Sequence, residues 1–571
     1  MSDSVPTSSF FATRHYFVLT LIALLFSGLI ARSAYLQVFN QDFLLDEGSQ
    51  RQLRTIETPA YRGTIMDRFG TPLAVSTPVD SVWVNPKLVL QDINGLKKVA
   101  KSLGLNFADT VDNLKQRADK EFVYLKRQIK PELASKAVEG VEGVYIQREY
   151  SRFYPAGEVV SHVLGFTDID NMGREGLELV YQDWLKARAG KRQILRNRKG
   201  EVVENISQVE AARAGNDLYT SIDMRLQYIT YRSLAKAIKY HDAKSGSAVL
   251  LDAKSGEVLA IANLPSYNPN QHKDKSAASR RNRAITDVFE PGSTIKPFTL
   301  AAALDKKLYS QDSRINTAPG YMKVTGFPIR DFSNYGVLDL AGILRKSSNV
   351  GASKIALSMQ PQDLWQAFKN YGFGEHPGVS FPASSSGYFN HYSNWQPLDQ
   401  ATMAFGYGLS VSTLQLARSY SLFANEGRIQ DVSLLRRDQP AESTQVMQAA
   451  TARMVLEMME EVVGPKGSAK QAAIPGYRVA GKTGTAKKSS AGGYLEDSYV
   501  AVFAGVVPVS NPRLVMAVMI NEPRQNGYYG GIVAAPVFQE VLSHALRLMN
   551  ISPDDLPSSG EVVRVATRAI L

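Results

Sequence analysis

A serine and a lysine stand three residues apart in the stretch "EPGSTIKPF", residues 290–298. On a helix, positions i and i+3 share a face, so the amine of Lys296 would lie beside the hydroxyl of Ser293. A serine becomes a nucleophile when a base takes its proton, and a lysine can be that base if burial or a neighbouring cation keeps its amine neutral. The pair therefore indicates acyl transfer through a serine ester.

The flanking residues fit a helix start. Gly292 allows an abrupt entry into a helix, and backbone N–H groups at such a start can hold an oxyanion. Pro297 fits only if the helix begins close by, and we expect it to leave the Ser293 carbonyl without its usual donor.

The S-x-x-K pattern is not specific by itself, because Ser233 and Lys236 repeat it. That copy lies inside the helical stretch "LQYITYRSLAKAIKY" and has no free helix N-terminus. We interpret it as structural.

Two further motifs follow the first serine in a consistent order. An S-x-N element, Ser347 to Asn349, begins 54 positions after Ser293, and a K-T-G element begins 135 positions later at Lys482. Other K-S-G and S-x-N copies lack this order and these surroundings. The ordered set gives the S-x-x-K pair its specificity.

Other chemistries are disfavoured by composition. Cysteine is absent, the seven histidines form no H-E-x-x-H or close pair, and no G-x-S-x-G occurs. These absences argue against a thiol nucleophile, a zinc enzyme and a nucleophile-elbow hydrolase, and we expect no metal and no cofactor.

The elements that position these residues begin after a membrane anchor. Residues 16–31 are uncharged and lie between Arg14 and Arg32, slightly short of the roughly 17 to 25 residues of a spanning helix. We expect an N-terminal tail at 1–15 and a retained transmembrane anchor at 16–35, because no small-residue cleavage site follows. The charges on its two sides do not decide its orientation.

The remaining chain divides into two folded parts and a tail. Residues 36–215 read as a non-catalytic mixed α/β pedestal with short strands first and helices over 90–140. Residues 216–550 read as α+β: a helix and two strands at one end, and three strands and a helix at the other, predict one antiparallel sheet flanked by helices. Residues 551–571 read as a loose tail.

The formal charge of +11 includes many acidic residues interspersed with the basic ones. The densest basic run, residues 185–201, is interpreted as a solvated face, with attraction to an anionic polymer or membrane surface as the alternative. Nucleic acid is not expected as a partner.

The motifs and their surroundings resemble a known family. "NRAITDVFEPGSTIKPF", "KSSNVG", "FGYGLSVSTLQLA", "GYRVAGKTGTAKK" and "YYGGIVAAPVF" resemble the division-specific class B penicillin-binding proteins, the septal peptidoglycan D,D-transpeptidases. "RGTIMDRFGTPLA", "RFYPAGEVVSHVLG" and "GREGLELVYQDWL" resemble that family's pedestal. The resemblance implies a serine β-lactamase-like transpeptidase domain.

The resemblance also implies roles for individual residues. Ser293 would attack the penultimate D-Ala carbonyl of a stem peptide, release D-Ala, and pass the acyl group to an amine of a neighbouring strand. The expected catalytic residues are Ser293, Lys296 as base, Ser347 as proton relay, Asn349 as hydrogen-bond partner of the substrate amide and of Lys296, and Lys482, which would hold the relay. The expected substrate-binding residues are Thr483, Gly484 and Thr485. The strand edge after Gly484 would pair with the substrate backbone, with Gly484 keeping that approach clear, and N–H groups of Ser293 and Thr485 would form the oxyanion hole.

Two departures from the family pattern are Ala404 and Ser468, neither of which is expected to touch a proposed catalytic atom. The resemblance further implies a single-pass inner-membrane protein at the division septum, with residues 1–15 as a cytoplasmic tail and the catalytic domain in the periplasm. The implied partners are stem peptides ending in D-Ala-D-Ala, β-lactam antibiotics, a membrane-embedded glycan polymerase and other division proteins.

Three alternatives stay open at this point. The same motifs serve carboxypeptidases and β-lactamases, which use water as acceptor, although the anchor and pedestal disfavour hydrolysis. The chain could be the elongation-specific class B enzyme, or a division scaffold whose active site is vestigial.

Overall fold

The computed structural model describes residues 9–42, 53–196, 202–271, 276–439, 441–490 and 493–556. The chain forms two compact units, one of residues 1–61 with 187–214 and one of residues 62–186 with 215–571. Much of the predicted pedestal therefore belongs to the same unit as the catalytic segments, while the predicted domain boundaries stay predictions.

The first unit contains the N-terminal helix α1 (Ser9–Ala34) and a π-helical turn, Tyr35–Phe39. Among the described residues, the 28 residues Ala12–Phe39 form the one helix long and apolar enough to cross a membrane. The helix continues past Arg32, whose guanidinium lies 5.5 Å from the ring centre of Tyr35. The uncharged run of residues 16–31 is shorter than a spanning helix, but the helix itself extends beyond both flanking arginines.

The first unit also contains a three-stranded antiparallel sheet in the order β1-β6-β7, made by Leu53–Thr58, Gly190–Arg196 and Val202–Glu210. The basic run of 185–201 contributes β6. Lys191 pairs with Glu210 across β6 and β7 at 3.7 Å, and both side chains are more than half exposed. This part of the run is a solvated face, and residues 197–201 lie outside the described residues.

The second unit begins with a sheet built on the long strand β3 (Pro72–Val84), which pairs with β4 (Val123–Ile129) and β5 (Val144–Phe153). The prediction of helices over 90–140 was correct for α4 (Ile93–Leu103), α5 (Phe107–Lys115) and α6 (Pro131–Val138), but wrong for β4. Pairing with β3 decides the conformation of β4, because strand preference depends on tertiary context.

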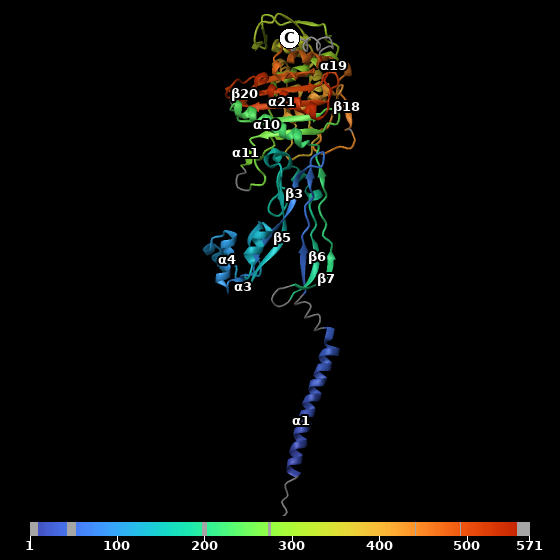
Figure 1. Cartoon of the computed structure of the whole chain (residues 1–571). Coiled ribbons are helices and arrows are strands. Elements are labelled where there is room, and N and C mark those ends of the chain that lie inside the picture. The colour runs from blue at the N-terminus through green and yellow to red at the C-terminus, as the bar shows by residue number, and fades with distance from the viewer. Residues whose placement is uncertain are drawn as a thin grey trace, which may run out of the picture. The chain divides into compact units, whose positions relative to one another are not determined.

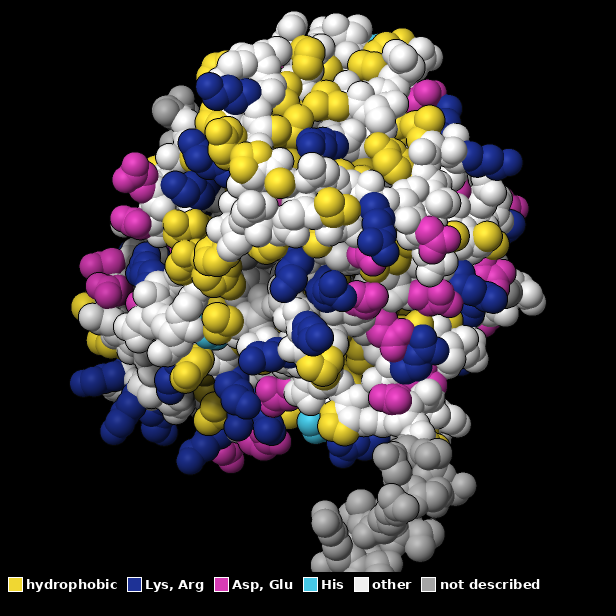
Figure 2. Space-filling model, turned by 90° about the horizontal axis from the view of Figure 1, so that it is seen from above, with side chains coloured by type: hydrophobic (Ala, Val, Ile, Leu, Met, Phe, Trp, Pro, Cys, Tyr) yellow, Lys and Arg dark blue, Asp and Glu magenta, His cyan; other side chains and the backbone are white. Residues whose placement is uncertain are grey.

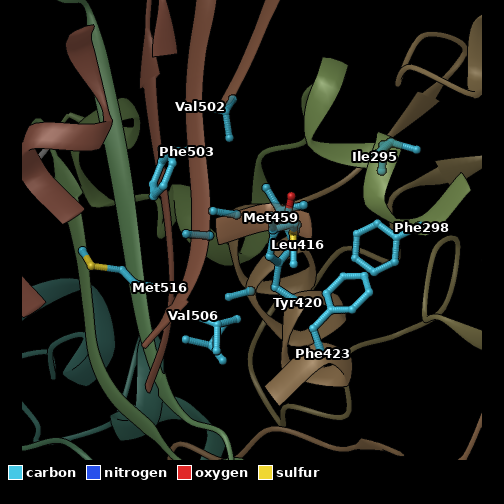
Figure 3. Close-up of a cluster of buried hydrophobic side chains, with 14 of the residues drawn as sticks. Ile295, Phe298, Leu416, Tyr420, Phe423, Met459, Val502, Phe503, Val506 and Met516 are labelled. Atoms are coloured by element: carbon cyan, nitrogen blue, oxygen red, sulfur yellow. The ribbon is translucent and has the colours of Figure 1, made fainter. Parts of the chain in front are cut away.

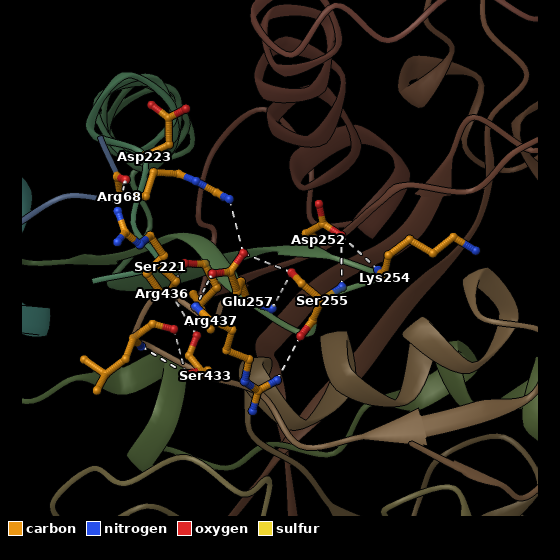
Figure 4. A network of polar contacts seen from close by, with 12 residues as sticks. Arg68, Ser221, Asp223, Asp252, Lys254, Ser255, Glu257, Ser433, Arg436 and Arg437 are labelled. Atoms are coloured by element: carbon orange, nitrogen blue, oxygen red, sulfur yellow. Dashed lines mark hydrogen bonds and ion pairs between the residues drawn. The ribbon is translucent and has the colours of Figure 1, made fainter. Parts of the chain in front are cut away.

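The short strands β2 (Ile65–Met66) and β8 (Leu218–Tyr219) join this sheet to the catalytic segments. Glu257 is the centre of the polar network there (Figure 4). Its carboxylate accepts hydrogen bonds from Arg68 Nη2 at 3.2 Å, from Ser255 Oγ at 3.1 Å and from the backbone N–H of Arg437 at 2.8 Å. The turn that carries Arg68 is thus bonded directly to the catalytic part.

The catalytic part is built on a five-stranded antiparallel sheet in the order β10-β9-β21-β20-β19. The strands are β9 (Ser245–Asp252), β10 (Val258–Leu264), β19 (Ala480–Ser490), β20 (Gly493–Val507) and β21 (Leu514–Asn521). The prediction of one sheet assembled from distant segments is confirmed. β19, which carries the K-T-G motif, is an edge strand.

Helices cover both faces of this sheet (Figure 1). On β20, Phe503 packs against Phe538 of α21 (Ala535–Leu548), with ring centres 4.8 Å apart, and α10 (Met224–Tyr240) packs beside α21. The preceding residue, Val502, points instead toward the side chains of α18 (Thr413–Ala424) (Figure 3). Because both faces are buried there, residues 248–251 of β9 and 500–507 of β20 read as continuous apolar runs.

Candidate active site

Ser293, the predicted nucleophile, stands on a tight turn that opens a helix. Gly292 has φ of +55°, and residues Gly292–Ile295 form a 3₁₀-helix that continues into α13 (Lys296–Asp305). Pro297 lies in the first turn of α13, where its missing N–H costs nothing. As expected, the Ser293 carbonyl lacks its usual donor, because Pro297 has no N–H; the N–H of Lys296 donates to it instead, in the 3₁₀ pattern.

Aromatic packing fixes this turn from behind. The ring centre of Phe298 on α13 lies 5.4 Å from that of Tyr420 and 4.9 Å from that of Phe423 (Figure 3). The hydroxyl of Tyr420 donates to the carbonyl of Thr294 at 2.8 Å. The residue next to Ser293 is therefore held by a buried hydrogen bond from α18.

Lys296 is completely buried, and its amine has three oxygen partners. Nζ lies 2.5 Å from the carbonyl of Ser347, 3.1 Å from Ser347 Oγ and 2.8 Å from Asn349 Oδ1. The S-x-x-K and S-x-N motifs, 54 positions apart in the sequence, thus meet at one amine.

The motif predicts that the amine of Lys296 lies beside the hydroxyl of Ser293, but the described residues show no hydrogen bond between the two side chains. The hydroxyl of Ser293 makes no side-chain hydrogen bond, while Lys296 is bonded to the S-x-N turn. Catalytic hydrogen bonds often form only when substrate is bound, so this geometry does not remove Lys296 as a base.

The S-x-N turn is held by an acidic residue that the sequence reading missed. Ser347 ends α14 (Leu340–Lys346) with φ of +56°, an uncommon conformation for serine, and α15 (Asn349–Leu357) begins two residues later. The carboxylate of Asp331 accepts hydrogen bonds from Ser348 Oγ at 2.6 Å and from the N–H of Asn349 at 2.5 Å. Asp331 follows strand β13 (Phe327–Arg330) and has no motif around it.

Lys482 reaches the same serine from the opposite side. Its amine, fully buried on β19, lies 3.0 Å from Ser347 Oγ. The hydroxyl of Ser347 therefore lies between two lysine amines, each within hydrogen-bond distance. This arrangement permits a proton to pass between Lys296, Ser347 and Lys482.

Electrostatics favour a neutral amine at this centre. Burial lowers the pKa of Lys482 to about 7. Burial also lowers the pKa of Lys296 well below its usual value, the charge of Lys482 lowers it further, and Asp331 acts in the opposite direction. A lysine with such a pKa can accept a proton near neutral pH.

The three predicted substrate-binding residues follow on β19. Thr485 Oγ1 accepts a hydrogen bond from the N–H of Gly530 at 3.0 Å, which leaves its own O–H able to donate to a ligand. Thr483 Oγ1 lies 3.2 Å from Ser468 Oγ. Ser468 therefore touches a predicted substrate-binding residue, although it touches no predicted catalytic one.

Gly484 has a different neighbour from the one predicted. A Cβ at Gly484 would lie 2.5 Å from the carbonyl oxygen of Pro291 and 3.0 Å from Thr294 Cγ2. The absent side chain makes room for the chain's own nucleophile turn, rather than for a substrate backbone.

The second S-x-x-K copy is structural, as interpreted from the sequence. Ser233 is buried in the middle of α10, whereas Lys236 points to solvent and pairs with Glu540 at 3.3 Å. One side chain is buried and the other is exposed, so the two do not form a common site.

An antiparallel sheet between helical layers, with a serine at a helix start and two buried lysines around a second serine, defines a serine acyltransferase of the penicillin-recognising class. Residues 246–543 match the family model described as "Penicillin binding protein transpeptidase domain", and residues 57–220 match "Penicillin-binding Protein dimerisation domain". The chain belongs to the class B penicillin-binding proteins, which are serine-type D,D-transpeptidases.

Curated relatives match over nearly the full chain. The "Probable peptidoglycan D,D-transpeptidase PbpC" of Pseudomonas aeruginosa is 41% identical over 551 residues, covering 96% of this chain and 97% of the relative. The "Peptidoglycan D,D-transpeptidase FtsI" of Escherichia coli is 40% identical over 556 residues, covering 96% and 94%. The apo transpeptidase domain of Burkholderia pseudomallei penicillin-binding protein 3 is 42% identical with a TM-score of 0.55, covering 59% of this chain and 98% of that domain.

Proposed function

We propose that this chain cross-links peptidoglycan stem peptides at the division septum with Ser293 as the nucleophile. Ser293 Oγ attacks the carbonyl of the penultimate D-Ala, and the bond to the terminal D-Ala breaks. That D-Ala leaves with a proton on its amine. An amine of a neighbouring stem peptide then attacks the ester, forms the new amide and restores the serine.

One observation carries the proposed mechanism: Ser347 Oγ lies 3.1 Å from Lys296 Nζ and 3.0 Å from Lys482 Nζ. Lys296, kept neutral by burial, takes the proton of Ser293. Ser347 passes a proton to the leaving amine, and Lys482 polarises Ser347. Asn349 holds the amine of Lys296 in place.

The neighbouring strand offers groups for the substrate itself. We assign the O–H of Thr485 and the hydroxyl of Thr483 to the substrate carboxylate, and the exposed edge of β19 to the substrate backbone. The N–H groups of Ser293 and Thr485 are the proposed oxyanion hole. A β-lactam would acylate Ser293 by the same attack.

The septal role rests on relatives named FtsI, and the anchor rests on α1. We propose a single-pass inner-membrane protein with a periplasmic catalytic domain that works beside a membrane-embedded glycan polymerase and other division proteins. The alternative is an elongation enzyme. Depletion distinguishes them, because loss of a septal enzyme gives filaments and loss of an elongation enzyme gives round cells.

Labelling with a fluorescent penicillin tests the chemistry. The full-length protein is expected to form a stable adduct, and Ser293→Ala is expected to form none. An adduct that persists in Ser293→Ala would contradict the assignment of the nucleophile, and no adduct in the native protein would favour a non-catalytic scaffold. Release of D-Ala without incorporation of an acceptor amine would indicate hydrolysis instead of transfer.

A further inference from the structure

A second cleft, of about 700 Å³, lies on the sheet beside the nucleophile turn. It lies among the start of β9, the middle of β20, the end of β21, residues 486–488 of β19 and the segment 281–290 that precedes Ser293. Its size is within the range of ligand-binding pockets. Its lining includes five cationic residues and two acidic ones: Lys244, Arg281, Arg283, Lys487 and Lys488, with Asp287 and Glu290.

Arg283 is the unusual member of this set. It follows Asn282 at the start of α12 (Arg283–Thr286), is only 7% exposed, and carries five N–H donors. Within the described residues its guanidinium makes one long hydrogen bond, 3.4 Å to the carbonyl of Arg281, and its nearest carboxylate, Asp287, is 4.0 Å away. Asp287 is already paired with Arg281 at 2.8 Å.

Buried arginines elsewhere in the same unit are paired much more closely. Arg62 and Arg152 each lie 2.6 Å from a carboxylate oxygen of Glu178. A buried charge without a close partner is costly, and burial accordingly lowers the pKa of Arg283. This difference indicates that Arg283 is available to bind an anion that enters the cleft.

The surrounding charges support this reading. Lys487 is exposed and makes no ion pair among the described residues, while Lys244 and Lys488 share the single carboxylate of Glu522. One oxygen of Glu290, Oε1, accepts hydrogen bonds from the N–H of Gly408 at 3.0 Å and from Tyr494 at 3.1 Å, while Oε2 is buried without a hydrogen-bond partner among the described residues. The five cationic residues of the lining still outnumber its two acidic ones. On parts of the face seen in Figure 2, in contrast, acidic and basic side chains are intermixed.

The cleft adjoins the reaction centre without containing it. Glu290 is three residues before Ser293, and Ala486 directly follows Thr485 on β19. A Cβ built on Gly292 would lie 3.6 Å from the Cβ of Ala486, so the turn and the strand are in contact there. A peptide bound in the cleft would therefore lie next to the acylated serine, on the same strand.

We propose that this cleft binds the carboxylates of the second stem peptide, whose amine accepts the acyl group. The inference rests on the proposed function, because a transfer between two stems needs two peptide sites. The edge of β19 is assigned to the donor stem. An acceptor stem carries the α-carboxylate of its γ-linked D-Glu and a C-terminal carboxylate, and a guanidinium fork binds a carboxylate through two parallel hydrogen bonds.

Binding to the acylated protein tests the proposal. Full-length protein in detergent is first acylated with penicillin, which both blocks the donor site and verifies the proposed chemistry. It is then titrated with the tripeptide L-Ala-γ-D-Glu-L-Lys by calorimetry. We expect binding to persist after acylation, and the same tripeptide with the D-Glu α-carboxylate amidated to bind at least about tenfold more weakly.

Variants of the guanidinium sharpen the test. We expect Arg283→Gln to weaken tripeptide binding about tenfold and Arg283→Lys to have an intermediate effect, since lysine keeps the charge but not the fork. The matched control is Arg453→Gln, which removes an arginine that is 74% exposed on another surface, and it should bind like the wild type. If Arg283→Gln lowers the melting temperature strongly, Lys487→Gln replaces it.

Three outcomes would overturn the proposal. Tripeptide binding that disappears on acylation would place the tripeptide in the donor site. Equal binding of the carboxylate and amidated tripeptides, or of the wild type and both cleft variants, would show that the cleft recognises no carboxylate. Parallel loss of penicillin acylation and tripeptide binding in the variants would show one site instead of two. A wild type that penicillin does not acylate would instead contradict the proposed function.

Discussion

At the scale of single residues, the centre of the site is the pair of buried amines on either side of the Ser347 hydroxyl. A positive charge on one amine makes protonation of the other amine less favourable. The charge of Lys482 is therefore one reason why the pKa of Lys296 is low. Lys296 must be neutral to accept a proton from Ser293. Acylation should therefore rise with pH as Lys296 loses its proton.

Lys482→Gln tests this coupling. Removing the neighbouring cation raises the pKa of Lys296, so the acidic limb of the profile of acylation rate against pH should move to higher pH. The rate itself should fall by about 10² to 10⁴, because the polarised relay is lost. The measurement is the second-order rate of penicillin acylation between pH 5 and pH 10.

Lys482→Arg is the control for this prediction. It keeps a positive charge beside Lys296, so we expect a lower rate with the acidic limb close to its wild-type position. An acidic limb that moves to lower pH in Lys482→Gln would contradict the electrostatic account.

At the scale of elements, the site depends on how closely the 3₁₀ turn approaches the edge strand. Gly484 on β19 and the Pro291 carbonyl before the turn leave no room for a methyl group, since a Cβ would lie 2.5 Å from that oxygen. Real Cβ atoms do not approach so closely, and the Pro291 backbone is not free to rotate away. The turn and the strand must separate if any side chain is added.

Gly484→Ala should therefore slow penicillin acylation by about 10 to 10², because a displacement of about 1 Å between reacting groups has an effect of that size. The chain should still fold, as judged by far-UV circular dichroism. Gly464→Ala is the matched control, since its Cβ would meet only ordinary contacts, the nearest at 3.5 Å. Acylation at the wild-type rate in Gly484→Ala would show that the turn has room to adjust.

The elements were more predictable from the sequence than the contacts between them. The strands of the central sheet are buried on both faces, and their apolar runs were visible; α21 and α10 were readable from their apolar spacing. β4 was missed because its pairing with β3 is not local.

In the site, too, the residues were more predictable than the contacts between them. The ordered motifs identified both lysines and both serines, since motif spacing is a property of the sequence. Asp331 was missed because its role arises only when the end of β13 meets the S-x-N turn, 16 residues further along the chain. The bond between Lys296 and Asn349 was implied by the family resemblance, whereas the bond from Lys296 to the carbonyl of Ser347 was not, because it depends on the left-handed turn at Ser347.

At the scale of the whole molecule, residues 62–186 and 215–571 form one compact unit, so the pedestal strands and the catalytic sheet should lose structure together. Glu257 connects the two by hydrogen bonds to Arg68 and Arg437. On the pedestal side of the unit, Glu178 is fully buried between the guanidinium groups of Arg62 and Arg152. Loss of this ion cluster should therefore also destabilise the active site.

Glu178→Gln should lower the free energy of unfolding by about 3 to 5 kcal/mol, because it leaves two buried arginines without a counter-charge. Glu121→Gln is the control: this residue is 74% exposed and pairs with Lys87 at 3.1 Å, and such surface pairs contribute about 0 to 1 kcal/mol. Circular dichroism and penicillin labelling of the full-length protein are followed on the same heating ramp. If the unit is cooperative, both transitions move down together in Glu178→Gln, whereas labelling that survives an earlier loss of ellipticity would show that the pedestal unfolds on its own.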